Sequence, residues 1–167
     1  MRVLGIDPGS AVTGYGLVEA NGGGGARLVE CGVIRTSARD PLLRRLRAIH
    51  EDVAALIRRH LPDVVAVEEA FHARNARTTL VLGQARGVIL LAAAQAEVEI
   101  AEYAPRVVKQ SVTGRGAALK PQVGYMVAQL LRLRSAPSPA DAADGVAVAL
   151  THLICSRRSR ARRAVVQ

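Results

Sequence analysis

The chain has 167 residues, 50% of them apolar, and its 23 Lys and Arg outnumber its 14 Asp and Glu, which gives a formal net charge of +9. This length and apolar content suit one packed domain of ordinary size. The positive charge favours a polyanionic partner, either nucleic acid or, as the weaker alternative, an anionic membrane surface. The sequence shows neither an apolar run near 18 residues nor a signal-peptide pattern, so we expect a cytoplasmic protein without a membrane span.

The first third of the chain predicts an antiparallel meander followed by a helix. Three short runs rich in apolar residues indicate strands, and the glycine-rich loop 21–25 joins the second to the third. A helix is expected to start at Asp40 and Pro41, because Leu, Ile and Val then recur at helical spacing up to Leu61. The three predicted strands are Val3–Asp7, Gly14–Glu19 and Arg27–Arg35.

The rest of the chain predicts two further strands and four helices. Val64–Glu68 is nearly all apolar, which is typical of a strand buried on both faces. The order βββαβαβααα indicates an α/β domain over residues 1–156, with a five-stranded mixed sheet flanked by helices. Residues 157–167 are rich in Arg and predict a disordered basic tail that either solubilises the protein or contacts DNA. The remaining predicted elements are a helix over Asn75–Ala96, a strand over Glu99–Tyr103, and helices over Pro105–Val112, Lys120–Leu131 and Ala140–Cys155.

Four acidic residues stand out against the cationic background. Asp7 and Glu68 each end an apolar strand, and ligands of α/β sheets collect beyond the carboxyl ends of parallel strands. Asp141 and Asp144 lie three residues apart, so they share one face of a helix. Carboxylates brought this close repel one another, and a divalent cation sustains such an arrangement. Oxygen ligands without a Cys or His cluster favour Mg²⁺ or Mn²⁺ over zinc.

Each of these acids also has a purely structural interpretation. Asp7 in the sequence Asp-Pro-Gly suits a turn, and Asp141 suits an N-terminal capping arrangement with Ser138. Asp144 lies one turn further into a helix rich in Ala and Val, where a carboxylate needs a partner. Periodicity leaves open whether Glu68 or its neighbour Glu69 faces the site.

Five short motifs occur in a characteristic order and spacing. They are Gly5–Ser10 with Thr13–Gly16, Val67–Phe71, Leu82–Gly87, Val108–Gln110 and Ala140–Asp144. Together they resemble the bacterial RuvC-type Holliday-junction resolvases, and the resemblance extends from Arg2 to about His152. It implies a ribonuclease H-like fold, a homodimer, a branch-migration motor as partner, and an Mg²⁺-dependent endonuclease that nicks two opposing strands of a four-way DNA junction. Hydrolysis with two Mg²⁺ ions per site, for which Mn²⁺ substitutes, suits the four acids.

The resemblance also assigns roles to individual residues. The catalytic and metal-binding acids that it implies are Asp7, Glu68, Asp141 and Asp144, which selects Glu68 over Glu69. The DNA contacts that it implies are base stacking by Phe71, phosphate contacts by Lys109 and Lys120, and a groove lined by Arg74, Asn75 and Arg77. Without the resemblance, Phe71 is an ordinary core aromatic and the two lysines are solvated helix ends.

Two further questions stay open at this point. The helix after Phe71 carries Gly83 and Gly87 on one apolar face, which suits close packing either on a second copy of the chain or on the sheet. A non-catalytic junction-binding module is an alternative function, although carboxylates facing phosphate without metal would weaken binding. An actin-like nucleotide-binding domain is a second alternative, but it needs another such domain and a second phosphate loop.

Overall fold

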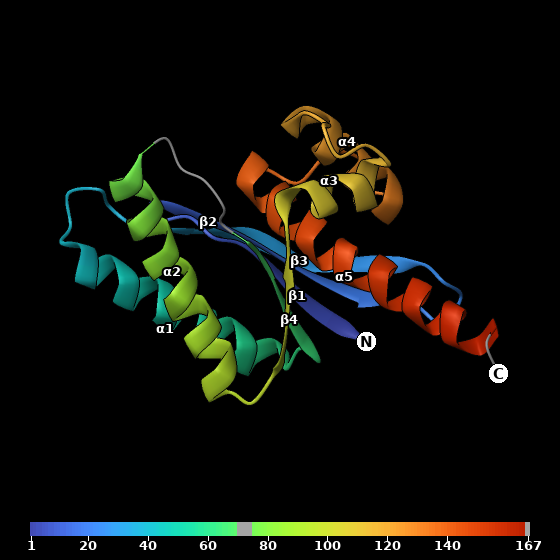
Figure 1. Cartoon of the computed structure of the whole chain (residues 1–167), viewed down its shortest axis with the longest axis horizontal. Coiled ribbons are helices and arrows are strands. Elements are labelled where there is room, and N and C mark those ends of the chain that lie inside the picture. The colour runs from blue at the N-terminus through green and yellow to red at the C-terminus, as the bar shows by residue number, and fades with distance from the viewer. Residues whose placement is uncertain (70–74, 166–167) are drawn as a thin grey trace.

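The computed structural model describes residues 1–69 and 75–165, which form a five-stranded sheet with helices on both faces (Figure 1). The strands lie in the order β3-β2-β1-β4-β5. Neighbours among β1, β2 and β3 are antiparallel, whereas β4 is parallel to β1 and β5 is parallel to β4. The strands are β1 Arg2–Asp7, β2 Val12–Ala20, β3 Ala26–Arg35, β4 Val64–Glu68 and β5 Glu99–Tyr103. The predicted meander and mixed sheet are therefore confirmed.

The helices form one layer on each side of the sheet (Figure 1). On one face α1 packs against α2, and on the other face α3 and α4 pack against α5, which itself contacts β1 and β2. The Asn75 side chain accepts a hydrogen bond from the Thr78 amide and so caps the start of α2. Gly114, in the left-handed conformation, ends α3. The helices are α1 Leu42–His60, α2 Ala76–Gln95, α3 Pro105–Thr113, α4 Lys120–Leu131 and α5 Ala140–Val165.

Strand alternation divides the core into two clusters, one on each face of the sheet. On β1, Leu4 and Ile6 pack with α1 and α2, whereas Val3 belongs to the cluster beneath α3, α4 and α5. Successive side chains of a strand point to opposite faces, so Asp7 lies on the same face as Val3. The acid at the end of β1 therefore faces α5, the helix that carries two of the other predicted acids.

Glycines allow α5 to lie directly on the strands. A Cβ atom on Gly5 of β1 would overlap the backbone of Gly145 and Ala149 in α5. A Cβ atom on Gly145 would in turn overlap the backbone of Tyr15 in β2. Backbone-to-backbone contact of this kind fixes the position of α5 relative to β1, and with it the distance between the acids on the two elements.

The last helix is longer than the sequence analysis predicted. We expected it to end near Cys155, but α5 continues to Val165, so the predicted helix end was wrong and the helical backbone enters the segment expected to be disordered. Residues 146–165 contain no Gly or Pro, and Ala and Arg are good helix formers, so nothing in this stretch stops the helix. Arg157 donates hydrogen bonds to the carbonyls of Gly24 and Gly25 in the loop between β2 and β3. The division into a domain of residues 1–156 and a tail of residues 157–167 stays a prediction.

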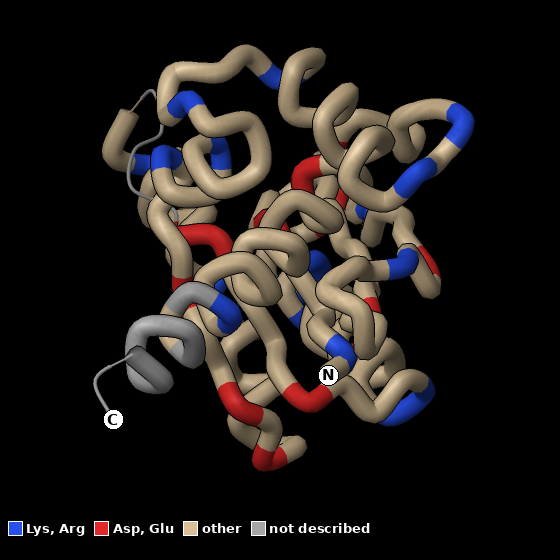
Figure 2. Tube along the Cα trace, turned by 90° about the vertical axis from the view of Figure 1, so that its right-hand side faces the viewer, with Lys and Arg blue, Asp and Glu red and all other residues tan. Residues whose placement is uncertain are grey.

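Basic residues are not confined to the end of the chain. Five of the 23 Lys and Arg lie in residues 157–163, and Figure 2 shows other basic positions around most of the outline of the Cα trace. The folded part of the chain therefore contributes to attraction of a polyanion together with its C-terminal segment.

Candidate active site

Three aspartates from distant parts of the chain meet at the carboxyl end of β1. Asp7 is the last residue of β1, and Asp141 and Asp144 lie in the first turns of α5. One carboxylate oxygen of each residue lies within 4.8 Å of the others. The spacing of three residues places both α5 acids on one helical face, as predicted, and the packing of α5 on β1 brings that face to Asp7.

Glu68 joins this group from the neighbouring strand. β4 is parallel to β1 with Val67 opposite Ile6, so Glu68 ends its strand beside Asp7. It lines one pocket with Asp7 and Asp144, although it is not among the three mutually close acids. We refer to Asp7, Glu68, Asp141 and Asp144 as the carboxylate cluster.

The structure also decides between the two adjacent glutamates. Val64 and Ala66 of β4 belong to the core cluster beneath α5, whereas Val65 and Val67 belong to the cluster beneath α1 and α2. Alternation therefore directs Glu68 to the α5 face. The Glu69 amide instead extends the pairing of β4 with β5, donating to the Tyr103 carbonyl over 2.9 Å.

Burial and neighbouring acids raise the pKa values of two carboxyls in the cluster. Burial, followed by the charge of Asp144, raises the pKa of Asp7 to about 7. Burial, followed by the charge of Asp7, raises the pKa of Glu68 to about 8. Neighbouring carboxylates thus oppose the ionisation of both groups, and a divalent cation would offset this repulsion.

Two lysines supply positive charge to the same pocket. Lys120, at the start of α4, places its Nζ atom 2.7 Å from Asp144 Oδ2 and 3.8 Å from Asp141 Oδ1. The hydrogen bond to Asp144 raises the pKa of Lys120. Lys109 of α3 lines the pocket as well. Both lysines predicted to contact phosphate therefore lie at the carboxylate cluster.

The donor set fits a divalent cation that prefers oxygen ligands. The three clustered aspartates offer hard carboxylate oxygens, and no Cys or His is part of this group among the described residues. The pocket has a volume of about 260 Å³, which exceeds the roughly 30 Å³ that one water occupies in the liquid several times over. The pocket therefore has room for more than one small group.

The other predicted DNA-binding residues lie at or before the start of α2. Phe71 and Arg74 fall outside the described residues. Asn75 is exposed and caps α2, its side-chain oxygen accepting hydrogen bonds from the amide and hydroxyl of Thr78 at 2.9 Å and 3.0 Å. Arg77 is exposed in the first turn of α2. DNA contacts by these residues stay predictions.

Sequence analysis named Thr13 as part of a motif but missed its role in shaping the loop after Asp7. Thr13 is fully buried, and its hydroxyl donates to the Gly9 carbonyl over 2.7 Å while accepting from the Gly9 amide over 3.3 Å. These bonds close the loop that leads away from Asp7. A single Thr in a strand sequence does not predict this role, because only the folded structure shows that its hydroxyl lies close to Gly9.

Comparisons with known proteins agree on one family. The family model "Crossover junction endodeoxyribonuclease RuvC" matches residues 3–152. A protein of that name from Pelotomaculum thermopropionicum is 51% identical over 152 residues, which cover 91% of this chain and 92% of the relative. The structure of Thermus thermophilus RuvC superimposes with a TM-score of 0.86 at 40% identity, covering 95% of this chain and 97% of that one. A structure of the same protein in complex with Holliday junction substrate gives a TM-score of 0.86 at 38% identity, with 95% and 96% coverage.

Proposed function

The chain belongs to the RuvC family of crossover junction endodeoxyribonucleases, and we propose that it resolves four-way DNA junctions by metal-dependent hydrolysis at the carboxylate cluster. The observation that carries this proposal is the convergence of Asp7, Asp141 and Asp144 within 4.8 Å, with Glu68 in the same pocket. The fold is ribonuclease H-like, as the match to Thermus thermophilus RuvC indicates.

The four carboxylates would hold two Mg²⁺ ions, for which Mn²⁺ would substitute. Bound there, the ions would supply an activated water and neutralise charge on the leaving oxygen in an in-line displacement. Water oxygen forms a bond to phosphorus, the bond from phosphorus to the 3′-oxygen breaks, and that oxygen takes up a proton. The products carry a 5′-phosphate and a 3′-hydroxyl.

The chain's own residues prepare the site for this reaction. Burial, followed by the charge of neighbouring acids, raises the pKa values of Asp7 and Glu68, and both carboxyls would lose their protons on binding a divalent cation. Lys120, released from Asp144, and Lys109 can then bind the non-bridging oxygens of the scissile phosphate. Phe71, Arg74, Asn75 and Arg77 would contact the DNA around the crossover, Phe71 by stacking on a base.

A cleavage assay with wild-type protein tests the proposed function. A mobile four-way junction and a linear duplex of the same sequence are incubated with Mg²⁺ or with EDTA. Paired nicks in opposing strands are expected in the junction alone and with Mg²⁺ alone, leaving ends that a ligase seals. Binding of the junction without cleavage would instead support the non-catalytic module, and ATP binding without either would support the nucleotide-binding alternative.

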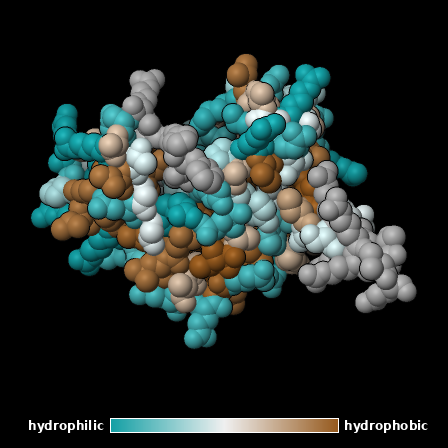
Figure 3. All heavy atoms as spheres, in the orientation of Figure 1, coloured by the Kyte–Doolittle hydropathy of each residue, from teal (hydrophilic) through white to brown (hydrophobic). Residues whose placement is uncertain are grey.

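We further propose a homodimer built on the outer face of α2. Leu80 and Leu91 are 69% and 49% exposed, and a Cβ atom on Gly83 or Gly87 would meet nothing within 4 Å. In Figure 3, hydrophobic surface gathers over the side of the molecule formed by α1 and α2. By length and composition α2 could also cross a bilayer, and 22% of its apolar window is buried. An exposed apolar face with small residues suits a second copy equally well, and a two-fold dimer would match a junction near two-fold symmetry.

The cellular setting follows from the proposed substrate. Junction DNA lies in the cytoplasm of a bacterial cell, so we place the protein there. A branch-migration motor acting on the same junction is a partner that the family resemblance implies.

A further inference from the structure

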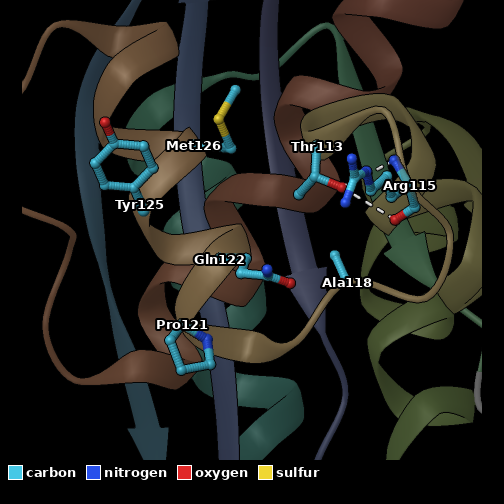
Figure 4. Close-up of a pocket in the computed structure, with 7 residues that line it drawn as sticks. All are labelled: Thr113, Arg115, Ala118, Pro121, Gln122, Tyr125 and Met126. Atoms are coloured by element: carbon cyan, nitrogen blue, oxygen red, sulfur yellow. Dashed lines mark hydrogen bonds between the residues drawn. The ribbon is translucent and has the colours of Figure 1, made fainter.

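A second hollow lies on the other side of the first turns of α4 from the active-site pocket. Lys120 and Val123 line the active-site pocket, whereas Gln122 and Tyr125 line this hollow, which has a volume of about 520 Å³. Figure 4 shows Tyr125 and Met126 on one side, Thr113 and Arg115 on the other, and Gln122 between them. We refer to this space as the α4 hollow.

Core packing does not explain the aromatic side chain of the α4 hollow. Tyr125 is 62% exposed, while Val123 and Val127 on the buried face of the same helix are 3% and 0% exposed. The Tyr125 ring therefore presents much of its surface to the solvent. An aromatic ring presented in this way can stack on a nucleobase of any sequence.

A fixed turn places a cation across the hollow from this ring. The Thr113 hydroxyl accepts from the Arg115 amide over 3.1 Å and donates to the Arg115 carbonyl over 3.0 Å, and Gly114 supplies the left-handed residue that the turn needs. Among the described residues, none that lines the hollow is Asp or Glu. The α4 hollow thus combines a π face with uncompensated positive charge, the combination that binds single-stranded or splayed DNA.

We propose that the α4 hollow binds a nucleotide of the DNA strand that the active site cuts, with its base on Tyr125 and a backbone phosphate at Arg115. This inference rests on the proposed function. The first turns of α4 separate the hollow from the carboxylate cluster, and a helix with its side chains is about 10 to 12 Å across. The bound nucleotide is therefore a neighbour of the scissile phosphate and not the nucleotide that is cut.

Continuity with the active site favours DNA over a protein partner as the occupant. Lys120 at the cluster and Pro121 in the hollow are consecutive residues, so a strand that leaves the cluster passes along the start of α4. Leu119 beside them is 67% exposed and offers apolar surface along this path. A peptide has no comparable reason to bind next to the phosphate-binding lysines.

Substitution of Tyr125 tests the stacking contact. Affinity for a fluorescent four-way junction is measured in EDTA for wild type, Tyr125→Ala and Tyr125→Phe. Loss of the ring should raise Kd at least about fivefold, the lower end of what base–aromatic stacking contributes, whereas Tyr125→Phe should bind like wild type. The thermal midpoint should stay unchanged, because the side chain is largely exposed.

Substitution of Arg115 tests the phosphate contact through the salt dependence of binding, which a loss of folded protein would not change. Arg115→Gln should lower the dependence of log Kd on log salt by roughly 0.7 to 0.9, the value for one lost phosphate contact. Arg58→Gln is the matched control, because it removes the same charge from an exposed position near the end of α1, on the opposite face of the sheet. That control should leave the salt dependence close to wild type.

The outcomes separate this inference from the proposed function. If wild type neither binds nor cuts the junction, the proposed function fails and this inference fails with it. If wild type cuts the junction while Tyr125→Ala and Arg115→Gln bind it as tightly and with the same salt dependence, the proposed function stands and this inference is overturned. The hollow would then be free for a peptide of a partner protein.

Discussion

At the scale of single residues, Lys120 neutralises part of the negative charge of the carboxylate cluster. Its ammonium contacts Asp144 and Asp141, and its charge lowers the pKa values of Asp7 and Glu68, which burial and neighbouring acids raise. A divalent cation bound at the cluster would take over this compensation, and Lys120 would then be available to a phosphate group.

The raised pKa values predict how stability depends on pH. Between the ordinary values of 3.8 and 4.5 and the folded values of about 7 and about 8, the folded protein holds more protons than the unfolded chain. The contribution of these two groups should therefore make the free energy of unfolding without metal fall as the pH rises from about 4 to about 8. Mg²⁺ should raise the thermal midpoint more at pH 8.5 than at pH 6, because protons compete with it at low pH.

Thermal unfolding over this pH range, with and without Mg²⁺, checks the prediction. Asp7→Asn removes one of the two titrating carboxyls, so its stability should depend less steeply on pH and respond less to Mg²⁺. A stabilisation by Mg²⁺ that is the same at pH 6 and pH 8.5, or that Asp7→Asn retains in full, would contradict the assignment of the metal to this cluster.

At the scale of elements, the contact of α5 with β1 sets the geometry of the site. Gly5→Ala places a methyl group against the backbone of Gly145 and Ala149, which cannot move aside as a flexible side chain would. We expect a loss of about 1 to 3 kcal/mol in the free energy of unfolding, as for other overpacked cores. Cleavage should fall further than stability alone explains, because displacement of α5 moves Asp141 and Asp144 away from Asp7.

Denaturant unfolding and single-turnover cleavage measure these two effects. Gly22→Ala is the control, since a Cβ atom there meets nothing within 4 Å. Gly5→Ala protein that unfolds and cleaves like wild type would show that close approach of α5 is not required.

Most elements could be predicted from the sequence because local signals specify them. Apolar runs marked β1 and β4, and the helical spacing that begins at Asp40 and Pro41 marked α1. The end of α5 could not be predicted, because the charge of the arginine-rich segment suggested disorder while its helix propensity favours continuation. The local sequence predicts the end of a helix reliably only where charge composition and helix propensity agree.

The site was predictable in part. The strand ends and the spacing of Asp141 and Asp144 placed three aspartates at one site. Spacing alone could not choose Glu68 over Glu69, because the choice depends on which face of β4 meets α5. Gly5 and Thr13 belong to motifs that the sequence shows, but their roles could not be predicted from them. The role of Gly5 depends on contact with α5, which is distant along the chain, and that of Thr13 on the conformation of the loop after Asp7.

At the scale of the whole molecule, the proposed dimer can be tested by placing a charge on the outer face of α2. Leu80→Asp should convert a dimer into a monomer at micromolar concentration, because it buries an unpaired carboxylate in the proposed interface. Sedimentation equilibrium measures the mass. Leu130→Asp, at a position on α4 that is 41% exposed on the other face of the sheet, should remain dimeric. A monomeric wild-type protein at this concentration would contradict the dimer.

The proposed dimer also predicts the outcome of cleavage. Two copies of the site related by a two-fold axis can cut opposing strands of one junction, whereas a single copy must bind twice. Monomeric Leu80→Asp protein should therefore produce mainly single nicks. Paired nicks from a confirmed monomer would separate resolution from dimerisation.

The most direct test of the carboxylate cluster compares two adjacent glutamates. Glu68 lines the active-site pocket, whereas Glu69 follows directly after β4 and its amide donates to the Tyr103 carbonyl. Glu68→Gln and Glu69→Gln change the charge equally, so single-turnover cleavage of a four-way junction with Mg²⁺ isolates the effect of position. Glu68→Gln should cleave roughly 100-fold or more slowly while still binding the junction, and Glu69→Gln should cleave like wild type. Cleavage by Glu68→Gln at the wild-type rate would contradict the assignment of the active site.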